Sequence, residues 1–272
     1  MTGGPQPTER QPERWHQNAE REERLTPCRS TGESVAATAG AALGNARLYR
    51  QVQEELLINR KFRQYLPTEV ADEVLRDPSA AARIGGREES LVVLFCDIAG
   101  FTRLSSVASA SEVVHGLNLW FELADPAITA ERGIIDKRMG DGILVVFREG
   151  GDHPVARAVR ASLAMQAALG ANRARLAHDA PAFAHVEVRH AIHYGRAILG
   201  NIGSASRIEY TVIGDAVNTA ARLEELTPAG EVWLTEDAVN AAPPGALPPV
   251  VRVGDVILRG RAQPTGLWRV EA

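Results

Sequence analysis

Two aspartates stand where carboxylates commonly do chemistry. Asp97 ends the apolar run LVVLFCD (residues 91–97), which is typical of a strand buried on both faces. A charge at the end of such a strand lies at a sheet edge, where ligands bind. Asp141 stands in the Gly-Asp-Gly turn of a hairpin predicted over residues 133–147. Taken alone, Asp141 fits an ordinary turn, but two carboxylates on adjacent strands can share Mg²⁺ ions that also bind substrate phosphates.

The residues after Asp97 offer a place for a phosphate. A glycine there permits a tight turn, and the successive backbone amides around it can converge on an anion. The segment consists of Ile98, Ala99, Gly100, Phe101 and Thr102. Amide donors are therefore expected directly beside a carboxylate.

Further polar groups of interest lie on a predicted helix and in the hairpin. Asn218 and Arg222 are four positions apart in DAVNTAARLEEL, so both project from one face of a helix. They can act on one ligand together or form an ordinary solvated face. Lys137 is one of only two lysines, with Lys61, among 30 basic residues. A lysine kept in an arginine-favouring sequence indicates a need for a compact point charge, with chance as the alternative.

The histidines and cysteines do not form a metal-binding pattern. His185, His190 and His193 crowd one predicted strand, but His190 differs in parity from the other two and so faces the opposite side. Cys28 lies in a polar tail and Cys96 in an apolar strand, which favours neither a disulfide framework nor a metal cluster. We expect these residues to be structural.

Composition restricts the classes of function. The formal net charge of -4 argues against a nucleic-acid partner, which would need clustered basic residues. No apolar run approaches the roughly 20 residues of a membrane span, and the N-terminus lacks the apolar core of a signal peptide. We therefore predict a cytoplasmic protein with no membrane span.

The chain is predicted to have three parts. Residues 1–35 are rich in Pro, Gln, Glu and Arg, a composition typical of a disordered tail. Residues 36–88 form a helical linker, because apolar residues recur at near-helical spacing from Ala36 to Leu66. This helix is expected to pair with its own copy, or else to pack on its own domain. Pro67 ends it, and a short helix follows over residues 68–75.

Residues 89–272 are predicted to form the main domain, with strands and helices alternating at short intervals. One sheet with helices packed on it, an α+β sandwich, accounts for this order. The expected elements are a strand over 91–97, a helix over 111–128 capped by Ser111, a hairpin over 133–147, a helix after Pro154, a strand over 186–195, a helix capped by Asp215 and reaching Leu226, and final strands in EVWLT and GLWRV.

Four segments resemble the class III adenylyl and guanylyl cyclase catalytic domain. In chain order they are LVVLFCDIAGFTRLS, GIIDKRMGDGILVVF, IHYGRAILGNIGS and EYTVIGDAVNTAARLE. The resemblance extends over nearly all of residues 90–272, and the order of the four segments makes a chance match very improbable. The resemblance implies a ferredoxin-like α+β fold with a mixed, mostly antiparallel sheet and packed helices.

The resemblance also implies roles for the polar residues. Asp97 and Asp141 would bind two Mg²⁺ or Mn²⁺ ions per active site, with the Ile98 carbonyl joining the metal shell. Asn218 would orient the ribose, and Arg222 would stabilise charge on the α-phosphate. The remaining phosphate contacts would come from Gly100, Phe101, Thr102, Arg196 and Arg261.

Base selection would depend on Lys137 and Thr211. By resemblance Lys137 would donate to N1 of adenine, where guanylyl cyclases usually carry glutamate. Thr211 stands where many adenylyl cyclases have aspartate, and its hydroxyl can accept from the adenine 6-amino group or donate. Threonine there is similar to a bacterial subgroup described as bicarbonate-responsive. The expected substrate is ATP, and the expected products are cyclic AMP and pyrophosphate.

The family resemblance further implies a homodimer. Each active site would take its aspartates from one protomer and its lysine, threonine, asparagine and arginine from the other. The segment AATAGAALGNARLYRQVQEEL resembles the closing helix of a GAF sensor domain and its linker. Two interpretations follow: an upstream sensor domain in a longer protein, or a simple tail over the first 35 residues. The alternatives are a guanylyl cyclase and a catalytically silent cyclase-like module. A diguanylate cyclase would need a GGDEF-like turn, which Met-Gly-Asp-Gly does not supply.

Overall fold

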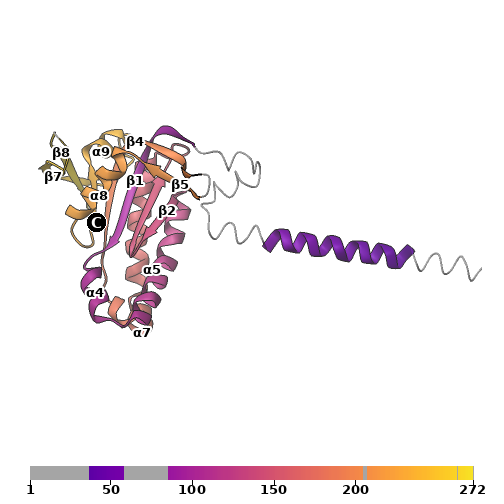
Figure 1. Ribbon diagram of the computed structural model, residues 1–272. Helices are drawn as coiled ribbons and strands as arrows, with labels where there is room; N and C mark the ends of the chain where they lie inside the picture. The colour runs from indigo at the N-terminus through magenta and orange to yellow at the C-terminus, as the bar shows by residue number, and fades with distance from the viewer. Residues whose placement is uncertain (1–36, 58–84, 205–206, 262, 272) are drawn as a thin grey trace, which may run out of the picture. The chain divides into compact units, whose positions relative to one another are not determined.

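The computed structural model describes residues 37–57, 85–204, 207–261 and 263–271 (Figure 1). The chain divides into two units, Met1–Gln64 and Tyr65–Ala272, and each is described by itself. Among the described residues, no helix is both long and apolar enough to cross a membrane.

The first unit contains a helix over residues 37–57 whose described residues are all exposed. Its exposed apolar side chains include Leu48, Val52 and Leu56, each more than half accessible. The predicted helix is thus confirmed for this stretch. The predicted tail over 1–35, the remainder of the helix to Leu66 and the short helix over 68–75 lie outside the described residues.

The second unit is built on a single mixed sheet. Among its described residues eight strands pair in the order β2-β3-β1-β4-β6-β8-β7, with β5 attached to β4. The pairings are antiparallel except that of β4 with β6. The strands are β1 Gly85–Ile98, β2 Ile134–Met139, β3 Gly142–Phe147, β4 Val188–Ser204, β5 Arg207–Ile213, β6 Val232–Thr235, β7 Val250–Val256 and β8 Thr265–Val270. The predicted α+β fold with a mostly antiparallel sheet is confirmed.

Both faces of the sheet are covered by helices. The helices are α4 Phe101–Val107, α5 Ala110–Ala130, α6 Pro154–Ala171, α7 Arg173–Asp179, α8 Asp215–Leu226 and α9 Glu236–Ala241, with a 3₁₀ turn, η1, at Pro181–Phe183. One hydrophobic core joins α5 and α6 to one face of the sheet, and a second joins α8 to the other. Strand β1 alternates between the two: Leu94 packs in the first core and Val93 in the second. This confirms the prediction, made from its apolar run, that the strand is buried on both faces.

Several boundaries differ from the sequence-based expectations. Strand β1 begins at Gly85 rather than 91, four residues before the predicted start of the domain, and β4 covers 188–204 rather than 186–195. Both strands are longer because β1 pairs with β4 over its whole described length, from Gly85 opposite Asn201 to Ile98 opposite Val188, and β4 continues to Ser204 in its pairing with β5. Such pairing depends on a partner distant in sequence.

Two predicted helix caps are wrong. The side chain of Ser109, not Ser111, caps α5 by accepting a hydrogen bond from the Glu112 amide. Asp215 is the first residue of α8 rather than its cap, and no side chain caps that helix. The preceding residue is Gly214, with φ of 140°, a conformation that a side chain would strain. The helix after Pro154 is confirmed, with proline at its first position.

Candidate active site

Asp97 and Asp141 come together at the end of β1. The turn between β2 and β3 places Asp141 beside β1, with Gly140 in the left-handed conformation at φ of 69°. The Asp141 carboxylate accepts a hydrogen bond from the Ile98 amide at 3.1 Å. The Asp141 carbonyl accepts from the indole N–H of Trp120 at 3.2 Å, and Trp120 is fully buried in α5. Hydrogen bonds therefore hold both the side chain and the backbone carbonyl of Asp141 in the turn.

The two carboxylates repel each other. Burial, followed by the hydrogen bond and charge of Asp97, raises the pKa of Asp141 to about 7. The Ile98 amide opposes this shift but does not cancel it. Two adjacent carboxylates in a half-buried position favour binding of a cation.

An arginine and a third carboxylate surround Asp97. Strand β4 places Arg189 directly opposite Asp97, and the guanidinium lies 3.3 Å from Oδ2 of that aspartate. The same guanidinium lies 2.8 Å from Oε1 of Glu224 in α8. Burial raises the pKa of Glu224 to about 7; Arg189 opposes the shift and Asp97 adds to it. Arg189 therefore contacts two acids, Asp97 and Glu224.

The donor set at Asp97 and Asp141 fits a divalent cation that is only partly held by protein. Carboxylate oxygens are hard ligands suited to Mg²⁺ or Mn²⁺. Within residues 37–57, 85–204, 207–261 and 263–271, no group of three or more His, Cys, Asp or Glu residues forms a metal site. Ions here would need further oxygen ligands from phosphate or water, as Mg²⁺ commonly has in nucleotide enzymes.

The predicted phosphate loop lies next to Asp97. Gly100, at φ of 73°, precedes α4, and Phe101 and Thr102 are the first two residues of that helix. Their amides therefore lie at a helix start, where backbone N–H groups have no intrahelical acceptor. Phe101 is anchored by an edge-on contact with the Phe183 ring.

Helix α8 presents different side chains to different surroundings. Glu224 points toward Asp97 of the same chain. Arg222 is two residues earlier, so it projects about 200° away around the helix. Its guanidinium lies beside Gly260, where an added Cβ would be 3.4 Å from Nη2. Asn218, one turn before Arg222, is exposed. Within one chain, Arg222 therefore faces away from the Asp97 carboxylate.

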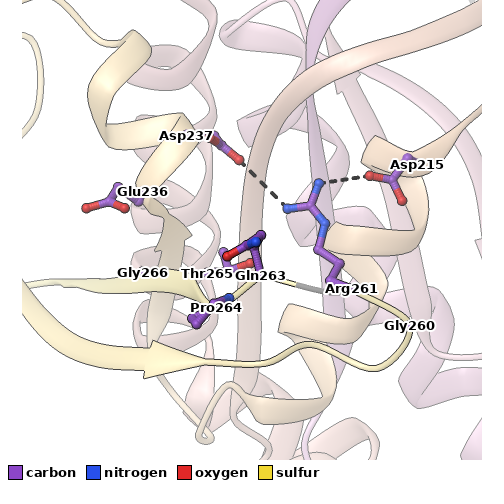
Figure 2. Close-up of a pocket in the computed structure, with 9 residues that line it drawn as sticks. All are labelled: Asp215, Glu236, Asp237, Gly260, Arg261, Gln263, Pro264, Thr265 and Gly266. Carbon is purple, nitrogen blue, oxygen red and sulfur yellow. Dashed lines mark hydrogen bonds and ion pairs between the residues drawn. The ribbon is translucent and has the colours of Figure 1, made fainter.

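Arg261 lies in a cleft at the start of α8, with a volume of about 580 Å³ (Figure 2). Its guanidinium binds Asp215 at 2.8 Å and reaches Asp237 at 3.9 Å. Arg196 shares an adjoining depression with Arg261. It is 71 % exposed and pairs with Glu88 at 2.9 Å. The structure thus brings the two predicted phosphate-binding arginines together.

Arg196 does not lie near the Asp97 carboxylate of its own chain. It stands opposite Ser90, seven residues along β1 from Asp97, or about 23 Å at strand spacing. Arg189 occupies the position beside Asp97 instead.

The predicted base-reading residues meet between β2 and β5. The Lys137 ammonium lies 2.5 Å from Glu209 and 3.6 Å from Asp136. Burial acts to lower the pKa of Lys137, but the two carboxylates outweigh it and the pKa is raised. The Thr211 hydroxyl donates to Asp136 at 2.9 Å. Both residues are therefore held by acidic neighbours.

The histidines are structural within the described residues. His190 is fully buried in β4, and burial lowers its pKa to about 3. His193 meets the Thr235 hydroxyl at 2.8 Å on the other side of the strand, as strand parity predicts. His185 lies before β4 begins, in a turn, so the prediction that all three share one strand is wrong.

Comparison with known proteins decides the family. Residues 86–269 match the model of the adenylate and guanylate cyclase catalytic domain. This chain belongs to that family. It is a class III nucleotidyl cyclase domain, as the four ordered segments predicted.

Relatives of the cyclase domain include both substrate types. It is 32% identical over 187 residues to an adenylate cyclase of Anabaena cylindrica, covering 67% of this chain and 37% of that protein. The chain thus spans little more than a third of this relative's length. Among solved structures, the guanylyl cyclase Cya2 is 31% identical with a TM-score of 0.61, covering 69% of this chain and 94% of that one. The adenylyl cyclase CyaB from P. aeruginosa is 26% identical with a TM-score of 0.63, covering 70% and 97%.

Four side chains at the candidate site were not predicted from the sequence. They are Asp136, Arg189, Glu209 and Glu224. One signal was visible in the sequence: Arg189 is a charged residue inside an otherwise largely apolar strand. The other three side chains could be placed at the site only from the strand pairing or from the packing of α8.

Proposed function

We propose that this cyclase is an adenylyl cyclase that converts ATP into 3′,5′-cyclic AMP and pyrophosphate at the interface of a homodimer. The observation that carries the choice of ATP is the Lys137 ammonium, which can only donate hydrogen bonds. Adenine presents an acceptor at N1, whereas guanine presents an N–H donor there. A lysine held between Glu209 and Asp136 therefore suits adenine.

The reaction is an in-line displacement at phosphorus. The ribose 3′ oxygen attacks the α-phosphorus, its proton is lost, and the bond to pyrophosphate breaks. Two Mg²⁺ or Mn²⁺ ions, when bound at Asp97 and Asp141, would lower the pKa of the 3′-hydroxyl and offset the charge on the phosphates. The protein's own contribution is to position the nucleotide and to offset charge that develops on the α-phosphate.

Each side chain has a role in this proposal. Asn218 orients the ribose, and Arg222 stabilises charge on the α-phosphate, with one helix turn fixing their spacing. The Ile98 carbonyl joins the metal shell. The remaining phosphate contacts come from the start of α4 and from arginines, namely Gly100, Phe101, Thr102, Arg189, Arg196 and Arg261.

The geometry of α8 supports a site shared between two protomers. Glu224 lies near Asp97 of its own chain, while Arg222 projects from another side of the helix. A two-fold dimer would let Asn218 and Arg222 of one protomer meet Asp97 and Asp141 of its partner. Two equivalent sites would result.

The test combines two inactive proteins. Asp97→Ala and Arg222→Ala variants are each expected to be inactive, because each damages a different half of the site. An equimolar mixture should regain about one quarter of the wild-type rate, since half of randomly formed dimers are mixed and each mixed dimer has one intact site of two. Chromatography of the products from ATP and from GTP identifies the cyclic nucleotide. A mixture as inactive as its components would contradict the shared site.

A guanylyl cyclase is the second candidate, supported by the 31% identity to the guanylyl cyclase Cya2. Lys137 argues against it, since its donors would face the N–H of guanine. Cyclic GMP as the main product would decide for this alternative. No product from either nucleotide, with Mg²⁺ or Mn²⁺, would decide for a catalytically silent signalling module.

A further inference from the structure

Asp136 is a buried carboxylate placed between the two residues proposed to read the base. The β2–β3 register shifts between Ile135 and Lys137, so an irregularity in β2 falls at Asp136. Its side chain is only 2 % exposed. A carboxylate at such a depth is costly unless it is well supplied with hydrogen-bond donors.

Three donor groups lie around the Asp136 carboxylate. Oδ1 accepts from the Val212 amide at 3.0 Å, and Oδ2 accepts from the Thr211 hydroxyl at 2.9 Å. The Lys137 ammonium lies 3.6 Å from Oδ2. Two adjacent residues of β5 are thus fixed by one side chain of β2.

The contact with Asp136 determines which way the Thr211 hydroxyl points. An ionised carboxylate only accepts, so the hydroxyl must direct its single proton toward Asp136. Thr211 is 6 % exposed, which leaves little room for the side chain to turn elsewhere. The lone pairs of the Thr211 oxygen remain, and they can only accept a hydrogen bond from a ligand.

We propose that Asp136 is a positioning residue for nucleotide selection: by holding the Thr211 proton, it makes Thr211 an acceptor for the adenine 6-amino group. This inference rests on the proposed adenylyl cyclase activity and explains how a threonine, which by itself can donate or accept, discriminates between the two purines.

The purine edges show why this matters. Adenine has a 6-amino donor and an N1 acceptor, whereas guanine has an O6 acceptor and an N1 donor. Against adenine, Lys137 donates to N1 and Thr211 accepts from the amino group. Against guanine, both contacts are mismatched, with donor facing donor and acceptor facing acceptor. Leaving polar groups unpaired in this way is what gives strong discrimination.

Asp136→Asn is the informative substitution, because it keeps the shape and changes the hydrogen-bond pattern. The asparagine oxygen can still accept from the Val212 amide, and its amino group can donate to the Thr211 oxygen. The Thr211 proton is then free to turn toward guanine O6. We expect the ratio of kcat/KM for ATP to that for GTP to fall at least about 10-fold.

Two further variants separate this role from others. Thr211→Val removes the hydroxyl at nearly constant volume and should lower the ATP-to-GTP ratio by a similar factor. In the Thr211→Val background, Asp136→Asn should change the ratio less than about 2-fold, because there is no proton left to direct. Glu209→Gln is the matched control, since it also removes a charge beside Lys137 but does not touch Thr211. Any change that it makes in the ratio should be the same with and without the Thr211 hydroxyl, because Glu209 contacts Lys137.

Binding measurements extend the test beyond turnover. The α,β-methylene analogues of ATP and GTP cannot release pyrophosphate, so calorimetry with them reports recognition alone. The analogue affinities should shift in the same direction as the kinetic ratio. Circular dichroism and thermal unfolding of each variant show whether it is folded, and Thr211→Val tests the idea even if Asp136→Asn is not.

The outcomes distinguish the two proposals. A wild-type protein that prefers GTP, or that forms no cyclic product, overturns the proposed function and this inference with it. A wild-type preference for ATP that persists in folded Asp136→Asn overturns the inference alone. The same is true if Asp136→Asn lowers the ratio equally with and without the Thr211 hydroxyl.

Discussion

The cyclase domain contains two acidic clusters that differ in how many hydrogen-bond donors the protein supplies to their carboxylates. The first surrounds the proposed metal ligands and is named the metal cluster; it consists of Asp97, Asp141, Glu224 and Arg189. The second surrounds the proposed base-reading residues and is named the base cluster; it consists of Asp136, Glu209, Lys137 and Thr211. In the metal cluster Arg189 pairs with Asp97 and with Glu224, and Asp141 accepts from the Ile98 amide. In the base cluster two carboxylates share the Lys137 ammonium, and Asp136 also accepts from a hydroxyl and a backbone amide.

The pKa values follow this difference. In the metal cluster, burial and neighbouring carboxylates raise the pKa of Asp141 and of Glu224 to about 7. In the base cluster, burial also raises the pKa of Asp136, but Thr211, Lys137 and Val212 oppose it. A bound cation would therefore favour the charged carboxylates of the metal cluster, whereas Asp136 of the base cluster already has donors from the protein. We infer that one is built to receive ions and the other to present fixed donors and acceptors.

The largest expected effect comes from neutralising a carboxylate of the metal cluster. Asp141→Asn should lower kcat for ATP at least about 100-fold, because a bound metal ion supplies several kcal/mol of charge stabilisation. Asp136→Asn should lower it less than about 10-fold, since Asp136 touches neither the metals nor the phosphates in the proposed site. Steady-state kinetics with ATP and Mn²⁺ measure both. Equal losses in the two variants would remove the distinction between the clusters.

The second prediction concerns the arginine of the metal cluster. Arg189→Gln leaves Asp97 and Glu224 without their cation and should lower kcat/KM for ATP about 10- to 100-fold. Arg196→Gln is the matched variant on the same strand; its side chain is 71 % exposed, and the loss should be smaller. The reverse order would show that the terminal phosphates depend on Arg196, as the family resemblance implied.

The third prediction concerns stability without metal. The folded pKa of Asp141 lies above its unfolded value, so the folded state binds more protons and stability is lost as pH rises from about 4 to 7. Asp141→Asn should therefore raise the free energy of unfolding at pH 7 by about 1 to 2 kcal/mol, and at pH 4 the gain should vanish. Adding MnCl₂ should raise the Tm of the wild type more than that of the variant. Urea unfolding in EDTA tests this, and a loss of stability at pH 7 would contradict it.

The smallest effect on selectivity is expected from the first unit. Deleting residues 1–60 removes the exposed apolar helix over 37–57 and leaves both clusters intact. We expect a change in dimer affinity or basal rate, measured by analytical ultracentrifugation and by assay, with the ATP-to-GTP ratio unchanged. If neither dimer affinity nor rate changes, the helix has no part in assembly.

The local parts of this fold were predictable from the sequence. The apolar run of β1, the Gly-Asp-Gly hairpin and the amphipathic α8 each depend on patterns within about 15 residues. The cap of α5 was missed by two positions, although Glu112 follows Ser109 by three residues, as a capping pattern requires. Nearby serines made the wrong choice equally compatible with the helical periodicity.

The residues that complete both clusters could not be predicted in this way. Arg189 meets Asp97 across 92 positions, and Asp136 meets Thr211 across 75. These contacts depend on the register of β1 with β4 and on the approach of β2 to β5, which no local pattern specifies. Site residues marked by a local pattern, such as a single turn, could be predicted from the sequence. Site residues brought together by strand register could not.

Helix α8 has a consequence for the proposed dimer as a whole. It is a single rigid segment of 12 residues that contacts one catalytic centre through Glu224 and would serve the other through Asn218 and Arg222. Any rotation that improves its fit to one nucleotide must also move Glu224 against Arg189 at the second centre. The two centres would then be coupled through α8, and nucleotide binding at the first would change the nucleotide affinity of the second.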